Sequence, residues 1–205
     1  MDSSIDIIVL GASYGGLQLI GELLQSLTVD FYLPLVIAQH QAKGSLESFG
    51  RGSEELLPYL LKEKSALNTV LIEDKQPIES HCIYIAPHDY HAFIEGDHFA
   101  LALAGPESIG CPSIDALFSS CADSYGSRRL GILFSGANHD GAAGVLNIAR
   151  KGGLVFVQNP HSAPAAAMPQ AAIDALRQHQ IGDRRYRILE LKQIADYLTT
   201  QAGQA

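Results

Sequence analysis

Short runs of consecutive apolar residues alternate with longer amphipathic stretches along most of this chain. The short runs are rich in aliphatic and β-branched residues and lie at 5–10, 33–38, 69–73, 82–86, 129–134 and 153–158. Helical spacing of apolar residues separates many of them, near 15–27, 45–62, 113–125, 141–151 and 164–179. Continuous apolar strands are typical of parallel sheets covered on both faces. The pattern therefore predicts a doubly wound α/β fold, with helices on both faces of a mostly parallel sheet.

The segment 82–103 departs from this alternation. Three apolar runs, at 82–86, 90–94 and 98–103, follow one another closely and are joined by the turn sequences Pro87-His-Asp and Glu95-Gly-Asp. Strands connected by such short turns favour hairpins. We therefore expect a small antiparallel insertion or edge near 82–103.

Length and apolar content predict one globular domain covering residues 1–205. Hydrophobic residues make up 47% of the 205 residues, which is enough to bury a sizeable core. No internal repeat, low-complexity tract or long Gly/Ser linker divides the chain.

The charge balance argues against nucleic acid as a partner. The formal net charge is −8, and the largest basic cluster is the short group Arg184-Arg185-x-Arg187. Proteins that bind nucleic acid gather Lys and Arg into a patch that neutralises phosphates. Such a patch is missing from the sequence pattern, so we expect no nucleic-acid partner.

Cysteine usage and the first residues predict a cytoplasmic protein. Cys82, Cys111 and Cys121 are odd in number and widely spaced, which suits reduced thiols better than disulfides or a zinc site. Acids at Asp2 and Asp6 stand where a secretory leader is basic. No apolar stretch approaches the roughly 20 residues that span a bilayer, so we expect no membrane insertion.

A glycine-bracketed serine follows the first predicted strand and opens into the first predicted helix. The residues are Gly11-Ala-Ser13-Tyr-Gly15-Gly. Gly-x-Ser-x-Gly is typical of a nucleophile elbow, in which small neighbours allow a tight turn, expose the hydroxyl and leave backbone N–H groups to stabilise an oxyanion. The same residues also fit a helix N-cap by Ser13 or a phosphate-binding loop.

Nucleotide and metal sites are less well supported by the detail of the sequence. A dinucleotide fingerprint has glycine where this chain has Ser13, and an acid at the end of the second strand, where this chain has Gln39-His40-Gln41. Possible metal ligands at His88-Asp89-Tyr90-His91 and His139-Asp140 lack the spacing of a metal motif. We expect no cofactor and no metal.

Three polar residues that follow predicted strands can together perform acyl transfer. Ser13 follows the first strand, His40 the second, and Asp140 the strand at 129–134. In doubly wound sheets such positions meet at the ligand crevice. A serine hydroxyl needs an imidazole to take its proton, and a carboxylate to orient that imidazole. Each residue also has a structural reading, because His40 can be a loop residue and Asp140 a helix cap.

Six blocks of the sequence, in this order, resemble the catalytic domain of the CheB-type chemotaxis methylesterases. They are Gly-Ala-Ser-Tyr-Gly-Gly (11–16), Ile-Ala-Gln-His (37–40), Ile-Tyr-Ile-Ala-Pro-His-Asp-Tyr-His (83–91), Pro-Ser-Ile-Asp-Ala-Leu-Phe (112–118), Ser-Gly-Ala-Asn-His-Asp-Gly-Ala-Ala-Gly (135–144) and Ala-Met-Pro-Gln-Ala-Ala-Ile (167–173). Six ordered matches are far more specific than any single motif.

This resemblance implies a serine hydrolase that removes methyl groups from glutamate methyl esters on chemoreceptor signalling helices and releases methanol. Some members of this family also deamidate receptor glutamines, so the resemblance implies that activity as a further possibility for this chain. Ser13, His40 and Asp140 fall on the family's triad positions, as nucleophile, proton relay and orienting acid. The resemblance further implies an oxyanion hole near the backbone of Tyr14, and a methylated receptor helix as the partner.

The chain also departs from the family pattern. Tyr14 stands where the family usually has a small hydroxyl residue, Cys111 replaces an arginine, and Ala137-Asn138-His139 replaces a Met-Gly-type segment. The family's receiver domain is absent, which implies a stand-alone member or regulation by a separate receiver or other chemosensory protein. These departures leave two other functions open, a non-catalytic binding or scaffold protein and a nucleotide-dependent enzyme.

Overall fold

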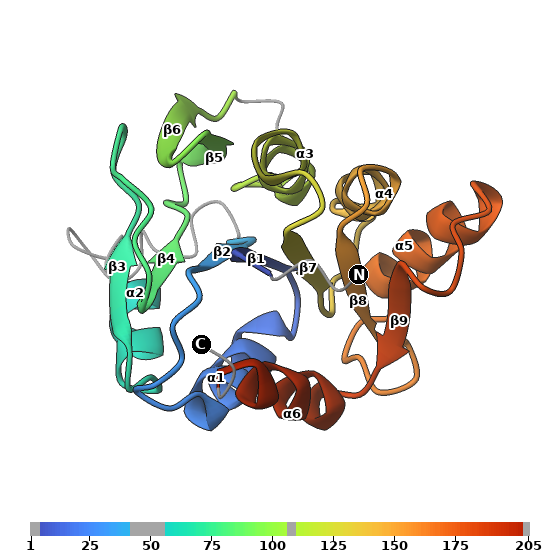
Figure 1. The fold of residues 1–205 in the computed structure, drawn as a ribbon, viewed down its shortest axis with the longest axis horizontal. Coiled ribbons are helices and arrows are strands. Elements are labelled where there is room, and N and C mark those ends of the chain that lie inside the picture. The colour runs from blue at the N-terminus through green and yellow to red at the C-terminus, as the bar shows by residue number, and fades with distance from the viewer. Residues whose placement is uncertain (1–4, 42–55, 106–109, 203–205) are drawn as a thin grey trace.

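A seven-stranded parallel sheet forms the centre of the molecule (Figure 1). The computed structural model describes residues 5–41, 56–105 and 110–202. The strand order is β3-β4-β2-β1-β7-β8-β9, and every neighbouring pair is parallel. The strands are β1 (Ile7–Ala12), β2 (Leu35–Gln39), β3 (Asn68–Leu71), β4 (Cys82–Ile85), β7 (Arg129–Leu133), β8 (Leu154–Gln158) and β9 (Tyr186–Leu189). The predicted doubly wound α/β class is confirmed.

Helices cover both faces of the sheet. On one face lie α3 (Ile114–Tyr125), α4 (Ala142–Arg150) and α5 (Ala167–Gln178). The other face is covered by α1 (Gly16–Ser26), α2 (Leu56–Lys62) and α6 (Leu191–Ala202). The part of the predicted 45–62 helix that precedes Leu56 lies outside the described residues.

Strand β1 shows why the apolar runs are continuous. Ile7 and Val9 point into the core under α3, α4 and α5, whereas Ile8 and Leu10 point into the core under α1 and α6. All four side chains are fully buried. A strand buried on both faces has no polar side, because alternate side chains enter two separate cores.

The antiparallel insertion is a two-stranded hairpin of β5 (Tyr90–Glu95) and β6 (His98–Leu103). It packs against α3, as Ser120 and Ser124 of that helix hydrogen-bond to the backbone of the hairpin. The first run of the 82–103 segment behaves differently from our expectation. Residues 82–85 form β4, which lies between β3 and β2 in the parallel sheet. Sequence proximity suggested pairing with the hairpin, but β4 has no polar face, and the doubly covered sheet buries it completely.

Two elements near the C-terminal end of the chain were not predicted. Strand β9 lies at the sheet edge, and two of its four residues are exposed, so it lacks a continuous apolar run. Helix α6 buries its pair Ile194 and Leu198, four residues apart, against the core next to α1. Both elements contact segments distant in sequence, since β9 pairs with β8 and α6 packs next to α1.

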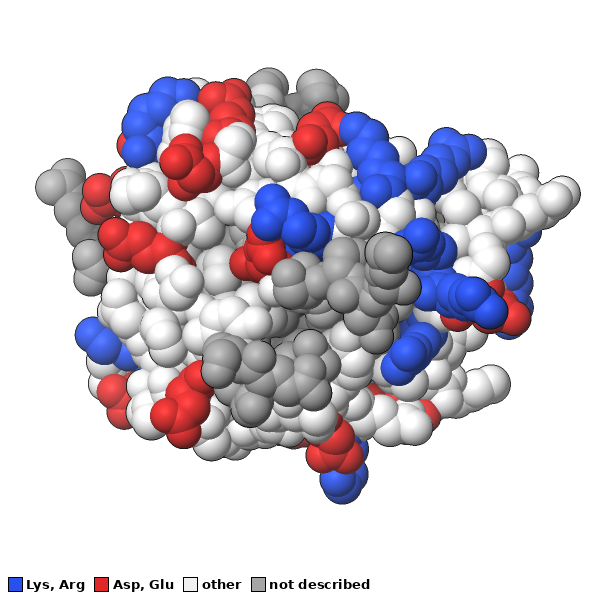
Figure 2. All heavy atoms as spheres, in the orientation of Figure 1, with Lys and Arg blue, Asp and Glu red and all other residues white. Residues whose placement is uncertain are grey.

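Charge is unevenly distributed over the molecule. On the face shown in Figure 2, Lys and Arg side chains gather over the region of α4, α5 and β9, and acidic side chains dominate the other half. Arg128, which precedes β7, forms an ion pair with Asp6, and Lys151, at the C-terminal end of α4, forms one with Asp123. No helix among the described residues combines the length and apolarity needed to cross a bilayer.

Candidate active site

Ser13 lies immediately after β1, at the carboxyl ends of the central strands. The parallel register pairs Ala12 with Gln39, the last residue of β2, so His40 is the register neighbour of Ser13. The His40 N–H donates to the carbonyl of Ala12 at 2.9 Å, which extends the strand pairing as far as these two residues. Adjacent strands lie about 4.8 Å apart, and the two side chains therefore start from neighbouring backbone positions.

The turn after Ser13 requires glycine. Gly15 has φ 75°, in the left-handed region, and it is the N-cap residue of α1. A Cβ atom there would lie less than 3.0 Å from the ring of Pro164. Helix α1 has no side-chain cap, so the reading of Ser13 as an N-cap serine is wrong. Among the described residues, nothing hydrogen-bonds to the Ser13 hydroxyl.

Gln39 and Ser135 hold the backbone of this turn by hydrogen bonds, Gln39 with its side chain and Ser135 with its carbonyl and its hydroxyl. The Ser13 N–H donates to the carbonyl of Ser135 at 2.8 Å, and the amide of Gln39 donates to the Ser13 carbonyl at 3.0 Å. The Ser135 hydroxyl donates to the Tyr14 carbonyl at 2.7 Å. The N–H groups of Tyr14 and Gly15 have no hydrogen-bond acceptor within the part of the chain that the structure describes. Two backbone donors thus stand beside Ser13.

His40 and Asp140, a hundred residues apart in the chain, are in direct contact. His40 Nε2 lies 2.7 Å from Asp140 Oδ2, and both side chains are nearly buried, with 7% and 14% exposure. Gly110 covers the His40 ring, since a Cβ atom at position 110 would lie less than 3.0 Å from three atoms of that ring. The imidazole is therefore held by a carboxylate at one nitrogen and by a glycine backbone against its face.

The Asp140 carboxylate lies at the N-terminus of α3. It accepts the backbone N–H groups of Ile114 at 2.8 Å, of Asp115 at 3.0 Å and of Gly141 at 3.0 Å. Burial opposes ionisation of this carboxyl, but the hydrogen bonds from His40 and from the α3 backbone outweigh it and lower the pKa of Asp140. Helix N-termini favour negative charge for the same reason. Asp140 therefore carries its charge at neutral pH.

The ionised carboxylate decides which His40 nitrogen carries the proton. An ionised carboxylate can only accept, so Nε2 must be the N–H that faces Asp140. The lone pair of the neutral ring is then on Nδ1, which lies 3.3 Å from the amide nitrogen of Asn138. Nδ1 is thus the nitrogen available as a base.

The other predicted and suspected residues lie around this centre. Tyr14 is 70% exposed beside Ser13. Cys111 is buried, its peptide bond to Pro112 is cis, and its thiol faces the Tyr90 carbonyl at 3.6 Å. His91 accepts from the Ser113 N–H. No three His, Cys, Asp or Glu side chains in the described ranges are grouped so as to hold a metal ion.

Three contributors to the site were not singled out from the sequence. Gln39 is the last residue of the buried strand β2, and Ser135 follows the buried strand β7 by two residues, so each is a buried polar residue next to an apolar run, a signal that the sequence does contain. Gly110 has no such signal, because its contact with His40 joins segments 70 residues apart.

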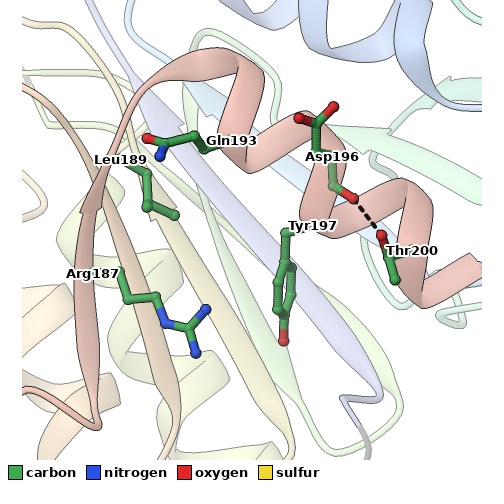
Figure 3. Close-up of a pocket in the computed structure, with 6 residues that line it drawn as sticks. All are labelled: Arg187, Leu189, Gln193, Asp196, Tyr197 and Thr200. Carbon is green, nitrogen blue, oxygen red and sulfur yellow. Dashed lines mark hydrogen bonds between the residues drawn. The ribbon is translucent and has the colours of Figure 1, made fainter.

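A separate pocket of about 460 Å³ opens between β9 and α6 (Figure 3). Its lining contains none of the predicted site residues and consists of Arg187, Leu189, Gln193, Asp196, Tyr197 and Thr200. The Arg187 guanidinium lies 6.0 Å from the ring centres of both Phe156 and Tyr197. The pocket is at the sheet edge, whereas Ser13 and His40 follow the central strands.

Comparisons with known proteins agree with this architecture. The family model described as CheB methylesterase matches residues 8–198. A Leptospira interrogans protein, provisionally named protein-glutamate methylesterase/protein-glutamine glutaminase, is 37% identical over 169 residues, covering 82% of this chain and 83% of its own length. A Methanospirillum hungatei protein of that name is 35% identical, and the match spans 46% of its length.

A solved structure shows the same fold. The Thermotoga maritima CheB methylesterase catalytic domain superposes with a TM-score of 0.81 at 24% identity, covering 97% of this chain and 99% of the other. The family match spans nearly all of the described elements, from β1 to α6. This chain is a member of the CheB methylesterase family.

Proposed function

We propose that this chain is a serine carboxylesterase that hydrolyses glutamate methyl esters on chemoreceptor signalling helices. Ser13 is the nucleophile, His40 the general base and Asp140 the orienting acid. The observation that carries the proposal is the 2.7 Å contact of His40 Nε2 with Asp140, at a position in register with Ser13. A base already paired with an ionised carboxylate, next to a serine on a glycine turn, is the arrangement that acyl transfer requires.

The proposed reaction has two stages. Ser13 Oγ attacks the ester carbonyl carbon while its proton passes to His40 Nδ1, and the oxyanion is stabilised by the N–H groups of Tyr14 and Gly15. The tetrahedral intermediate then expels methanol, which takes the proton from His40 and leaves a glutamyl ester on Ser13. Water then loses a proton to His40 and attacks the carbonyl carbon of that ester. The bond to Ser13 Oγ breaks, His40 returns the proton to Ser13 Oγ, and the glutamate carboxylate is released. With a glutamine substrate, ammonia leaves in place of methanol.

The proposal includes the setting in which the enzyme works. We propose that residues 1–205 form a single catalytic domain that acts in the cytoplasm. One continuous sheet with a core on each face supports the single domain. The three cysteines form no disulfide and are buried, which suits a reducing compartment. The exposed ring of Tyr14 stands where a receptor helix would approach Ser13.

Replacement of the nucleophile tests the proposal. In Ser13→Ala, release of methanol from methylated receptor should fall by at least about 10³-fold, because no other hydroxyl can form the acyl-enzyme. Ser26→Ala, at the opposite end of α1, is the matched control and should retain full activity. Methanol release by the Ser13 variant at the wild-type rate would reject Ser13 as the nucleophile.

One observation favours a non-catalytic binding protein as the second candidate. The Ser13 hydroxyl is not hydrogen-bonded to His40 in this structure, although the two residues are neighbours in register. Labelling with a fluorophosphonate distinguishes the two functions, since the reagent bonds only to an activated serine. A labelled Ser13 supports the esterase, whereas an unlabelled protein that still binds receptor helices supports the binding protein.

A further inference from the structure

Asn138 contacts both His40, the base, and Asp140, its orienting acid. Its side-chain oxygen accepts the backbone N–H of Asp140 at 3.1 Å, and its side-chain nitrogen lies 3.3 Å from His40 Nδ1. The backbone N–H is a donor only, so the oxygen of the Asn138 amide must face it. The NH₂ group of Asn138 therefore faces the His40 ring.

The neutral His40 ring can accept only one hydrogen bond, so Asn138 and Ser13 compete for the same nitrogen. Nε2 donates to Asp140, and the neutral ring has one remaining lone pair, in the ring plane at Nδ1. The Asn138 amide occupies that lone pair. The Ser13 hydroxyl cannot bond to Nδ1 with good geometry while Asn138 does so, which agrees with the absence of any partner for Ser13 Oγ among the described residues.

The relative strengths of the two contacts show what Asn138 adds. Hydrogen bonds to an ionised group are roughly twice as strong as neutral ones, and the Asp140 contact is 0.6 Å shorter than the Asn138 contact, at 2.7 against 3.3 Å. Asp140 alone therefore suffices to place the proton on Nε2. The added effect of Asn138 is occupation of Nδ1, through a bond long enough to be displaced.

We propose that Asn138 is a positioning residue that caps the base nitrogen of His40 in the resting enzyme and is displaced by the Ser13 hydroxyl before proton transfer. The inference rests on the proposed function. Exchange of one hydrogen bond for another is all that this step requires, with no covalent change. Asn138 thereby sets the fraction of enzyme in which Ser13 is activated.

Three substitutions separate this role from support of the loop. Asn138→Ser keeps an oxygen that can accept the Asp140 N–H but cannot reach His40. Asn138→Ala loses both contacts. Asn138→Asp keeps the contact with Asp140 and turns an acceptor toward Nδ1, which favours a proton on that nitrogen and removes the base.

The kinetic readout is phosphonylation of Ser13 by a fluorophosphonate, in which Ser13 Oγ bonds to phosphorus, fluoride leaves and His40 takes the proton. We expect the rate constant to rise about fivefold in Asn138→Ser, the worth of one weak neutral hydrogen bond. In Asn138→Asp it should fall at least about tenfold. Equal losses in the Ser and Ala variants would show that Asn138 only supports the loop, and would overturn the proposal.

A second readout is independent of activity. In a Ser13→Ala background, ¹⁵N NMR of the His40 ring should show Nε2 protonated, and Nδ1 should move downfield when Asn138→Ser is added, as an unprotonated ring nitrogen does on losing a donor. Nε2 should not move. An unmoved Nδ1 signal overturns the inference, even if the esterase is real. If the wild type fails to react with fluorophosphonate but Nδ1 moves, the capping contact stands and the proposed function fails.

Discussion

Two neighbouring carboxylates show how strongly the surroundings of single residues determine this site. Burial and the nearby charge of Asp140 raise the pKa of Asp115, although a backbone hydrogen bond from Gly144 opposes the shift. Asp140 is also buried, but the hydrogen bonds from His40 and from two backbone groups of α3 lower its pKa. Of these two carboxyls, the one whose pKa is lowered, Asp140, is the one that contacts the imidazole of His40.

Replacing Asp140 tests this electrostatic role. In Asp140→Asn, kcat should fall by about 10³-fold or more, because an amide neither fixes the Nε2–H tautomer nor stabilises the imidazolium. The folded pKa lies below the ordinary value of 3.8, so the stabilising effect of the charge is present above that value and is lost as pH falls through the folded pKa. Urea unfolding should therefore show a gap between wild type and variant that is constant above about pH 5 and narrows below about pH 4. A gap that widens in acid would contradict the assignment.

Gly110 provides a purely steric test at the same scale. A Cβ atom there would overlap the His40 ring, so Gly110→Ala should displace the imidazole and lower kcat/KM by about 10²-fold. Gly105→Ala is the matched control, because a Cβ atom at position 105 meets nothing within 4 Å. Steady-state kinetics of both variants measure the effect. Equal activity of the two would mean that the ring tolerates displacement.

At the scale of elements, the junction of β1 and α1 carries the nucleophile. The strand ends at Ala12, the helix begins at Gly16, and the three residues between them include the left-handed Gly15. The Ser135 carbonyl accepts the Ser13 N–H, and the Gln39 amide donates to the Ser13 carbonyl, so this turn is held by its backbone. The Ser135 hydroxyl also donates to the Tyr14 carbonyl, so the carbonyls of Ser13 and Tyr14 are both hydrogen-bonded, whereas the N–H groups of Tyr14 and Gly15 have no acceptor among the described residues and are left for a substrate.

Gly15→Ala should destabilise the protein for two reasons that a control can separate. A non-glycine residue in the left-handed region costs about 1–2 kcal/mol, and contact with Pro164 adds to that. Gly96→Ala, at the β5-β6 turn, has a similar φ of 64° but meets nothing within 4 Å. Urea unfolding should give a loss of about 1 kcal/mol for Gly96→Ala and at least about 2 kcal/mol more for Gly15→Ala. Equal losses would remove the steric part of the explanation.

At the scale of the whole molecule, Ser135 links three loops of the site. It follows β7 and is fully buried. Its hydroxyl accepts the N–H of Ala165 at 2.8 Å and donates to the carbonyl of Tyr14 at 2.7 Å. One side chain therefore joins the loops that follow β1, β7 and β8. The three loops follow strands β1, β7 and β8, which are neighbours in the sheet.

Loss of this link should affect stability and activity together. Ser135→Ala removes the partner of the part-buried Ala165 N–H and of the part-buried Tyr14 carbonyl, which costs about 1–3 kcal/mol in the free energy of unfolding. The Tyr14 carbonyl would also lose its restraint, so kcat should fall while the fold persists. Ser162→Ala, an exposed hydroxyl, is the control for both urea unfolding and kinetics. An unchanged free energy of unfolding would show that water replaces the hydroxyl.

The periodicity of apolar residues by itself determined the α/β class and the positions of most strands and helices, and the glycines on either side of Ser13 predicted the turn there. These features depend on neighbours in sequence, because strand and helix periods and the φ of glycine are local properties. The sequence also showed that His40 follows one buried strand and that Asp140 follows another.

Only the tertiary structure decided the contacts between distant segments. It placed β4 in the parallel sheet, gave β9 and α6 their partners, and set the Asp140 carboxylate on the N-terminus of α3 with His40. It also put Asn138 on the base nitrogen. No local period encodes such contacts, because they depend on how elements far apart in sequence pack together and which backbone groups that packing leaves to be satisfied.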